Sequence, residues 1–133
     1  MSEENAATLR RYLGILNEGG ESPLDLIHSE WEAHMFRGSP IPGPYRGHPG
    51  HERWRRDTFD VIEDWRIELD EIIETDDADL LIALERFVGR MRHTGLKANF
   101  PLTVVVRFKD GLIYRFDGYR NRAEALEAAG LRD

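Results

Sequence analysis

The sequence predicts an α+β fold in which helices pack on one face of a curved antiparallel sheet. Three observations support this expectation: helical periodicity in the first half of the chain, consecutive strand-like segments in the second half, and a length of 133 residues. A chain of this length is typical of one domain with a hydrophobic core, so residues 1–133 are expected to form a single domain.

The first half contains two long helix candidates. Residues 5–17 place leucines and a tyrosine three and four positions apart, and two glycines follow. A short helix over about 23–28 and a strand over 31–37 lead into a loop over 38–50, which is rich in glycine and proline. The second long helix is expected over about 49–64, because proline is favourable in the first turn of a helix.

The second half contains strands separated by short segments rich in aspartate and glycine. Residues 92–99 form either a loop or a splayed hairpin. A short C-terminal helix should follow, since Asn121 and Glu124 have the spacing of a capping box and Gly130 can end the helix. The four strand candidates cover residues 65–74, 79–93, 100–109 and 112–120.

Alternation along the last two strands predicts which side chains face the helices. Successive side chains of a strand point to opposite faces of the sheet. The odd positions include Arg107, Arg115 and Asp117, so Asp117 is expected outside, paired with a neighbouring arginine, with Ile113 on the same face. The expected inward set consists of Phe100, Leu102, Val104, Val106, Phe108, Leu112, Tyr114, Phe116 and Gly118.

The segment at residues 80–84 is apolar at every position. A strand that is buried on both faces needs a cover on each side. The helices supply one cover, and we expect a second subunit to supply the other, which predicts a homodimer formed through the outer sheet face. Leu80, Ile82 and Leu84 are expected on the inner face, so Arg86 is expected to follow them into the interior.

Composition argues against several classes of function. The net charge is −7, and acids surround the one dense basic cluster, Arg53, Arg55 and Arg56, so no nucleic-acid surface is expected. No apolar run approaches the roughly 20 residues that span a bilayer, and no signal peptide is visible. The chain has no cysteine and no cofactor motif. These features favour a cytoplasmic protein without a membrane partner or a cofactor.

Several motifs resemble one known family. The most specific are PYRGHPG (44–50) and RFKDGLIYRFDGYRNRAEAL (107–126). With these segments the chain resembles the SnoaL-like branch of the nuclear transport factor 2-like superfamily over nearly its whole length. The resemblance implies a cone-shaped α+β fold with a deep pocket between helices and sheet, usually as a dimer. The fold hosts ketosteroid isomerases, epoxide hydrolases, polyketide cyclases, dehydratases and non-catalytic binders, so the site residues must decide the function.

The resemblance to ketosteroid isomerases implies three site positions. Isomerisation needs a carboxylate base and donors that stabilise a developing oxyanion. Tyr12, within YLGILN, matches the tyrosine donor, whereas the positions of the base and of the second donor fall on Ala33 and Val104. Neither residue can perform those roles. Tyr12 is also a core position of its helix, so a packed tyrosine whose hydroxyl reaches the pocket is the alternative interpretation.

The resemblance to epoxide hydrolases implies an arginine between two aspartates. Arg86 matches the arginine, but the two acid positions fall on Val88 and Gly118, so that mechanism is not supported. Arg86 could still anchor an anionic or carbonyl-bearing ligand, or it could form a structural ion pair near the rim of the cone.

Polar residues interrupt the expected inward face of the second long helix. His51, Arg55 and Thr58 occupy positions where a core helix would be apolar. They either face the cavity, where His51 could act as an acid or base, or they reach the edge of the helix, which we favour for Arg55. His48 and His51 lack a third ligand, so no metal site is expected. His34 should lie outside the pocket.

These observations lead to the hypothesis of a pocket for a small apolar or amphipathic molecule, with no activity assigned. One alternative is a cyclase, isomerase or hydrolase with an unfamiliar acid–base pair, for which Tyr12, His51 and Arg86 are the catalytic candidates. Another is a protein-interaction or assembly module that uses the exposed sheet. The expected ligand-binding residues are Tyr12, Trp31, Trp54, Thr58, Arg86, Val88, Leu102, Val104, Phe116 and Gly118.

Overall fold

The computed structural model describes residues 2–131, and within them the elements follow the predicted order. Some ends shift: the first strand begins at Ile27 instead of 31, and the second long helix ends at Val61 instead of 64. A two-residue strand also lies inside the predicted loop. The elements are α1 (Ser2–Asn17), η1 (Leu24–Leu26), β1 (Ile27–His34), β2 (Tyr45–Arg46), α2 (Gly47–Val61), β3 (Ile62–Glu74), β4 (Leu80–Met91), β5 (Lys97–Lys109), β6 (Leu112–Tyr119) and α3 (Arg122–Ala128).

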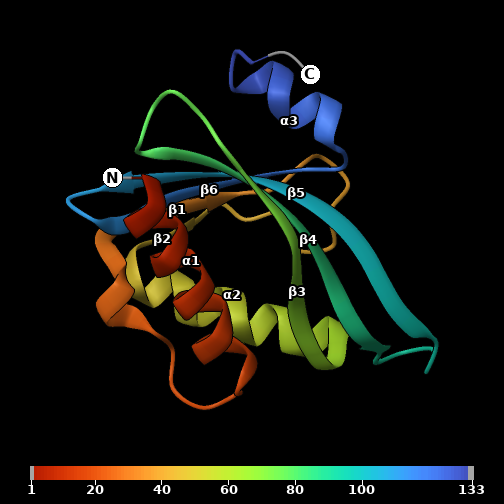
Figure 1. Ribbon diagram of the computed structural model, residues 1–133. Helices are drawn as coiled ribbons and strands as arrows, with labels where there is room; N and C mark the ends of the chain where they lie inside the picture. The colour runs from red at the N-terminus through yellow and green to blue at the C-terminus, as the bar shows by residue number, and fades with distance from the viewer. Residues whose placement is uncertain (1, 132–133) are drawn as a thin grey trace.

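The strands form one sheet in the order β2-β1-β6-β5-β4-β3. The long strands β3, β4 and β5 bend around α1 and α2, and the sheet does not close on itself (Figure 1). This arrangement confirms the α+β prediction with a curved sheet and a short C-terminal helix. The expectation of a wholly antiparallel sheet is wrong at one pair: β1 lies parallel to β6. A parallel pair is possible there because most of the domain separates the two strands in the sequence.

The main core lies between the concave face of the sheet and the two long helices. Leu102, Val104, Val106 and Phe108 belong to it, as alternation predicted for β5. The prediction fails at the start of β6, where Ile113 is buried in this core instead of Leu112 or Tyr114. The β5–β6 ladder has a register shift between Arg107 and Phe108. Because of this shift, the inward residues of β6 are odd-numbered near Ile113 and even-numbered from Phe116 onward.

The outer face of β4 and β5 is covered within the same chain. A second apolar cluster joins Leu80, Ile82 and Val105 of the sheet to Ala125 and Leu126 of α3. The predicted inner position of Leu80 and Ile82 is therefore wrong, and no second subunit is needed to explain their burial. The homodimer itself stays a prediction.

The cap of α3 agrees with the predicted motif. The side chain of Asn121 accepts a hydrogen bond from the Glu124 amide at 2.9 Å, and Gly130 follows the helix with φ of 76°. These contacts fix the helix that closes the outer face.

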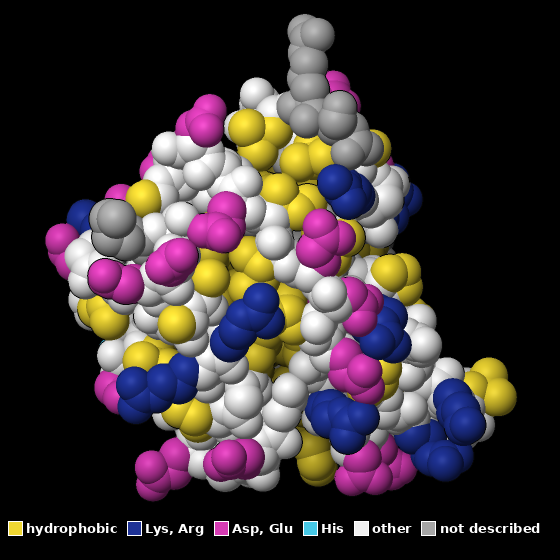
Figure 2. All heavy atoms as spheres, viewed as in Figure 1, with side chains coloured by type: hydrophobic (Ala, Val, Ile, Leu, Met, Phe, Trp, Pro, Cys, Tyr) yellow, Lys and Arg dark blue, Asp and Glu magenta, His cyan; other side chains and the backbone are white. Residues whose placement is uncertain are grey.

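The basic residues of α2 bind local partners. Arg53 donates to the Pro44 carbonyl, and Arg55 donates to Ser22 and Gly20 at the helix edge, as predicted for Arg55. On the face shown in Figure 2, lysine and arginine side chains are interspersed with acids and form no continuous basic patch. None of the described helices is long and apolar enough to cross a membrane.

Candidate functional site

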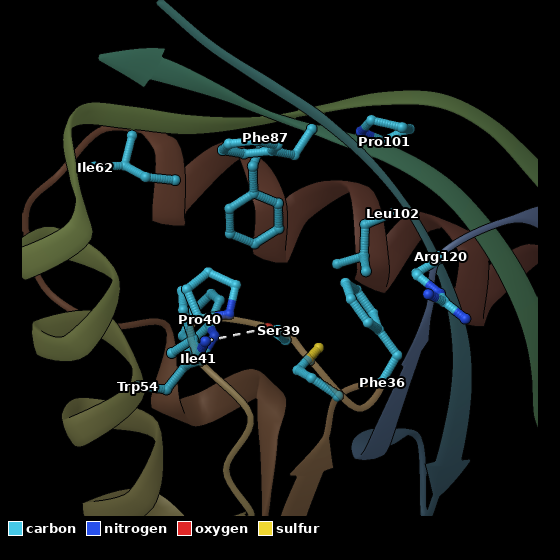
Figure 3. A pocket seen from close by; sticks show the side chains of 12 residues that line it. Phe36, Ser39, Pro40, Ile41, Trp54, Ile62, Phe87, Pro101, Leu102 and Arg120 are labelled. Carbon is cyan, nitrogen blue, oxygen red and sulfur yellow. Dashed lines mark hydrogen bonds between the residues drawn. The ribbon is translucent and has the colours of Figure 1, made fainter. Parts of the chain in front are cut away.

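A cavity of about 300 Å³ lies between α2, the sheet and the loop after β1. Phe36, Phe87 and Leu102 point into this space, and Arg120 lies at one edge (Figure 3). The guanidinium of Arg120 is mostly exposed and bonds Glu124 at 3.5 Å. The lining residues are Met35, Phe36, Ser39, Pro40, Ile41, Trp54, Ile62, Phe87, Phe100, Pro101, Leu102 and Arg120. We call this space the outer cavity.

A much smaller space, which we call the inner chamber, lies deeper between the helices and the sheet. Its volume is about 20 Å³, close to the room that one water molecule needs. Met35, Trp54, Phe87 and Leu102 line both spaces and so form the boundary between them. The residues found only in the inner chamber are Tyr12, Leu13, Ile67, Glu85, Val104 and Phe116.

Glu85 is the one acid of the inner chamber, and alternation along β4 did not predict it there. It pairs with Leu102 across the β4–β5 ladder. Residues directly opposite each other in an antiparallel pair point to the same face, and Leu102 faces inward. The same pairing places Phe87 opposite Phe100. The inner face of β4 is therefore its odd-numbered set, and the all-apolar run at 80–84 concealed this from the sequence.

The environment of Glu85 favours the uncharged acid. The residue is 7% exposed, and no hydrogen bond or ion pair joins its carboxyl to another residue within 2–131. Burial raises the pKa of Glu85 to about 8, because the carboxylate would lose its hydration without gaining a partner. A carboxyl group with this pKa can donate or accept a proton near neutral pH.

Arg86 and Val88 lie on the outer face of the sheet, so their prediction as interior residues is wrong. The guanidinium of Arg86 donates to both carboxylate oxygens of Asp70, at 2.8 and 2.9 Å, and to Glu68 at 3.1 Å. A register shift between Leu69 and Glu71 accompanies this arrangement. Arg86 thus forms the structural ion pair that was the alternative interpretation, since its charge is satisfied away from the cavity.

Tyr12 connects the inner chamber to a buried histidine. The hydroxyl of Tyr12 lies 2.7 Å from Nε2 of His51, and both residues are buried. Burial, followed by the charges of Arg55 and His48, lowers the pKa of His51 to about 3, so its ring is neutral at physiological pH. Burial also raises the pKa of Tyr12 well above its usual value. His51 therefore holds the Tyr12 hydroxyl in place from behind and does not itself line either space.

Some of the other predicted site residues line the inner chamber, and the rest pack behind it or within α2. Trp54, Leu102, Val104 and Phe116, which are predicted to bind a ligand, line the inner chamber. Thr58 does not line either space, because its hydroxyl donates to the Trp54 carbonyl within α2 at 2.8 Å. Trp31 packs behind the inner chamber, with its ring 5.0 Å from that of His51 and 5.7 Å from that of Phe116.

Gly118 leaves room for a neighbouring side chain, not for a ligand. A Cβ atom at this position would collide with the sulfur of Met35 and would lie 3.3 Å from a methyl group of Leu102. The side chain of Met35 therefore occupies the space that a carboxylate at position 118 would need. Asp117 points to the other face, where Arg115 binds it at 2.9 Å, as predicted. His34 is also outside, 3.2 Å from Glu32.

Comparison with known proteins identifies the family of the chain. A family model described as a SnoaL-like domain matches residues 9–116. The chain belongs to the SnoaL-like domain family. No curated protein matches this SnoaL-like chain.

Several solved structures share the fold of this SnoaL-like domain. Bal32a, from a soil-derived mobile gene cassette, is 20% identical over 89% of each chain, with a TM-score of 0.78. An NTF2-like protein of unknown function from Burkholderia pseudomallei is 20% identical over 93% of this chain and 95% of its own, with a TM-score of 0.73. TerC, co-crystallised with polyporic acid, is 17% identical over 93% and 96%, with a TM-score of 0.76. At these identities the likenesses establish the fold alone.

The site of this SnoaL-like domain differs from both enzyme patterns that the resemblance implied. Ala33 is buried in the core and Val104 lines the inner chamber, so neither supplies an acid. The acid comes from Glu85, which lies on β4 next to the strand that carries Val104. Among residues 2–131, no group of three or more histidine, aspartate or glutamate side chains is arranged to hold a metal ion. The site therefore offers Glu85 and Tyr12 as its inward-facing polar groups that can exchange protons.

Proposed function

We propose that this protein binds a small, largely apolar molecule in the outer cavity, with one polar group directed at Glu85. The observation that carries the proposal is an apolar cavity of about 300 Å³ next to a smaller chamber that is lined by the buried acid Glu85. Ligand pockets in proteins are commonly of this size and kind, with few polar groups that fix orientation.

Two further observations support the proposal. Aromatic side chains stand at the boundary between the two spaces: the ring centroids of Trp54 and Phe87 are 6.4 Å apart, and Trp65 stacks on Phe87 at 6.2 Å. These contacts hold Trp54 and Phe87 in place. TerC, which has the same fold, was co-crystallised with polyporic acid, which is consistent with uptake of an organic molecule by a protein of this shape.

Blocking the boundary between the two spaces tests the proposal. Leu102→Trp is expected to weaken binding of the neutral dye N-phenyl-1-naphthylamine at least tenfold, because the larger ring fills the cavity at the point where both spaces meet. Binding is measured by the rise in dye fluorescence. Leu96→Trp introduces the same residue at a turn position that is 67% exposed and should leave binding unchanged. Equal dye affinity in Leu102→Trp and the unmodified protein would place the ligand elsewhere.

A second candidate function is proton transfer of the isomerase or cyclase type. The specific observation is that Glu85, with a pKa of about 8, shares the inner chamber with Tyr12. Glu85 can then remove a proton next to a carbonyl group, and the Tyr12 hydroxyl can stabilise the oxygen. His51 takes no proton in this scheme, since its ring lies behind Tyr12.

Deuterium exchange tests this second function directly. The protein is expected to speed exchange of the α-protons of cyclohexanone in D₂O, followed by NMR. Glu85→Gln should remove this acceleration, because positioned general bases contribute roughly 10²- to 10⁴-fold. Tyr12→Phe should also reduce the acceleration of exchange, while this variant should still bind the dye. Exchange that continues in Glu85→Gln would exclude Glu85 as the base.

A further inference from the structure

The inner chamber holds a carboxyl group, that of Glu85, which has no hydrogen-bond or ion-pair partner among residues 2–131. Of the residues that line it, Glu85 and Tyr12 are the ones that titrate. The Tyr12 hydroxyl already has His51 at 2.7 Å, whereas no hydrogen bond or ion pair reaches the Glu85 carboxyl from the described part of the chain. Burying an ionised carboxyl group without a partner costs free energy. A ligand that forms an ion pair or a hydrogen bond with Glu85 offsets that cost, which favours its binding.

The size of the inner chamber restricts what can reach Glu85. About 20 Å³ accommodates one group the size of a water molecule. A primary ammonium group is of that size, whereas a trimethylated ammonium is several times larger. The hydrocarbon part of such a molecule has the outer cavity available, beyond the boundary formed by Met35, Trp54, Phe87 and Leu102.

The surroundings of Glu85 also favour a cation. Trp54, Phe87, Tyr12 and Phe116 line the chamber, and the ring centroids of Tyr12 and Phe116 are 5.7 Å apart. Aromatic faces attract cations, most strongly where water is excluded. The oxygen atom of Tyr12 can accept a further hydrogen bond from an ammonium group.

We propose that the inner chamber binds a primary ammonium group at Glu85, so that the ligand of this protein is a small amphipathic amine whose hydrocarbon part fills the outer cavity. The inference rests on the proposed function, because it names the chemical class of the molecule that the cavity takes. An amine binds as an ion pair, whereas a hydroxyl or carbonyl ligand accepts a hydrogen bond from the protonated acid.

These two kinds of ligand give opposite dependences on pH. Glu85 must be ionised to pair with an amine, and a primary amine keeps its proton up to a pH of about 10. Since the pKa of Glu85 is about 8, the affinity for an amine should rise about tenfold from pH 6 to pH 7 and level off above pH 8. A hydrogen-bond acceptor should instead lose affinity above pH 8. Tyr12 is the other titratable lining group, and its pKa is raised well above 10, outside this window.

Calorimetric titration with hexylamine and hexan-1-ol tests the inference. At pH 8 the unmodified protein is expected to bind hexylamine at least tenfold more tightly than hexan-1-ol, and the advantage should shrink at pH 6. Glu85→Gln should abolish the advantage while keeping the affinity for hexan-1-ol within about threefold. Glu127→Gln, the same change at an exposed position of α3, should behave as the unmodified protein. N,N,N-trimethylhexylammonium should bind at least tenfold more weakly than hexylamine.

The outcomes separate the two proposals. If neither hexylamine nor hexan-1-ol binds, and the neutral dye does not bind either, the proposed function fails. If hexan-1-ol or the dye binds but hexylamine has no advantage, or its affinity falls with rising pH, the proposed function stands and the amine inference is overturned. Equal binding of the primary and the trimethylated amine would also overturn it, because the larger head group cannot enter the inner chamber.

Discussion

Replacing Glu85 with glutamine is expected to remove the contribution of this residue to the pH dependence of stability, a fall of about 4 kcal/mol between pH 5 and pH 8.5. The pKa of Glu85 is about 8 in the folded chain against an ordinary value of 4.5, so between these values the folded state holds a proton that the unfolded state has released. The contribution of Glu85 to the free energy of unfolding is therefore fully present below pH 4.5 and is lost as the pH rises through 8. The magnitude follows from about 1.4 kcal/mol for each pH unit between the two pKa values.

Urea unfolding followed by tryptophan fluorescence at pH 5, 6.5 and 8.5 measures this effect. The quantity to compare is the change in free energy of unfolding with pH, in Glu85→Gln and in the unmodified protein. Glu127→Gln should keep the full alkaline loss, since Glu127 is exposed. The same alkaline slope in Glu85→Gln would mean that Glu85 is ionised in the folded protein at neutral pH, with a partner or water that satisfies it.

Replacing His51 with glutamine is expected to remove a contribution to stability that falls by a similar amount at acidic pH. The pKa of His51 is about 3 in the folded chain against 6.5 for an ordinary histidine. The folded state thus holds fewer protons than the unfolded state between these values. Stability from the neutral ring is present above pH 6.5 and is lost as the pH falls through 3, by about 4 kcal/mol between pH 7 and pH 3.5. Glutamine is chosen because it is neutral and can still bond the Tyr12 hydroxyl.

The two buried groups together predict a plateau of stability. Between about pH 4.5 and pH 6.5 the slopes from Glu85 and His51 have opposite signs and cancel. A plot of the free energy of unfolding against pH should then have one sloping limb in each variant and two in the unmodified protein. His93→Gln, which changes a histidine in an exposed turn, should keep both limbs. An unchanged acid limb in His51→Gln would assign that limb to other residues.

Much of the fold could be predicted because its signals are local. Apolar spacing in α1, alternation in β5, and the Asn121 cap each depend on a few neighbouring residues. The family resemblance then supplied the arrangement of the elements. The parallel pairing of β1 with β6 is a property of the whole chain, and no short segment of the sequence records it.

The candidate site was predicted less well because it depends on which face of β4 turns inward. When residues 80–84 are apolar throughout, alternation cannot choose between the odd and the even set, and the prediction selected Arg86 over Glu85. The hairpin register decides the question: Met91 donates to the carbonyl of Leu96, and from there Glu85 falls opposite Leu102. Tyr12 could be found from the sequence, since it combines a core position with the resemblance to the isomerase tyrosine.

The contact between Gly118 and Met35 constrains how the sequence of this protein can change over time. An aspartate at position 118 would approach the hydrolase pattern, yet any side chain there collides with the sulfur of Met35. Because this sulfur belongs to a flexible side chain, a change at position 118 requires Met35 either to swing aside or to be replaced by a smaller residue. Either response changes the lining of both spaces, since Met35 borders the outer cavity and the inner chamber.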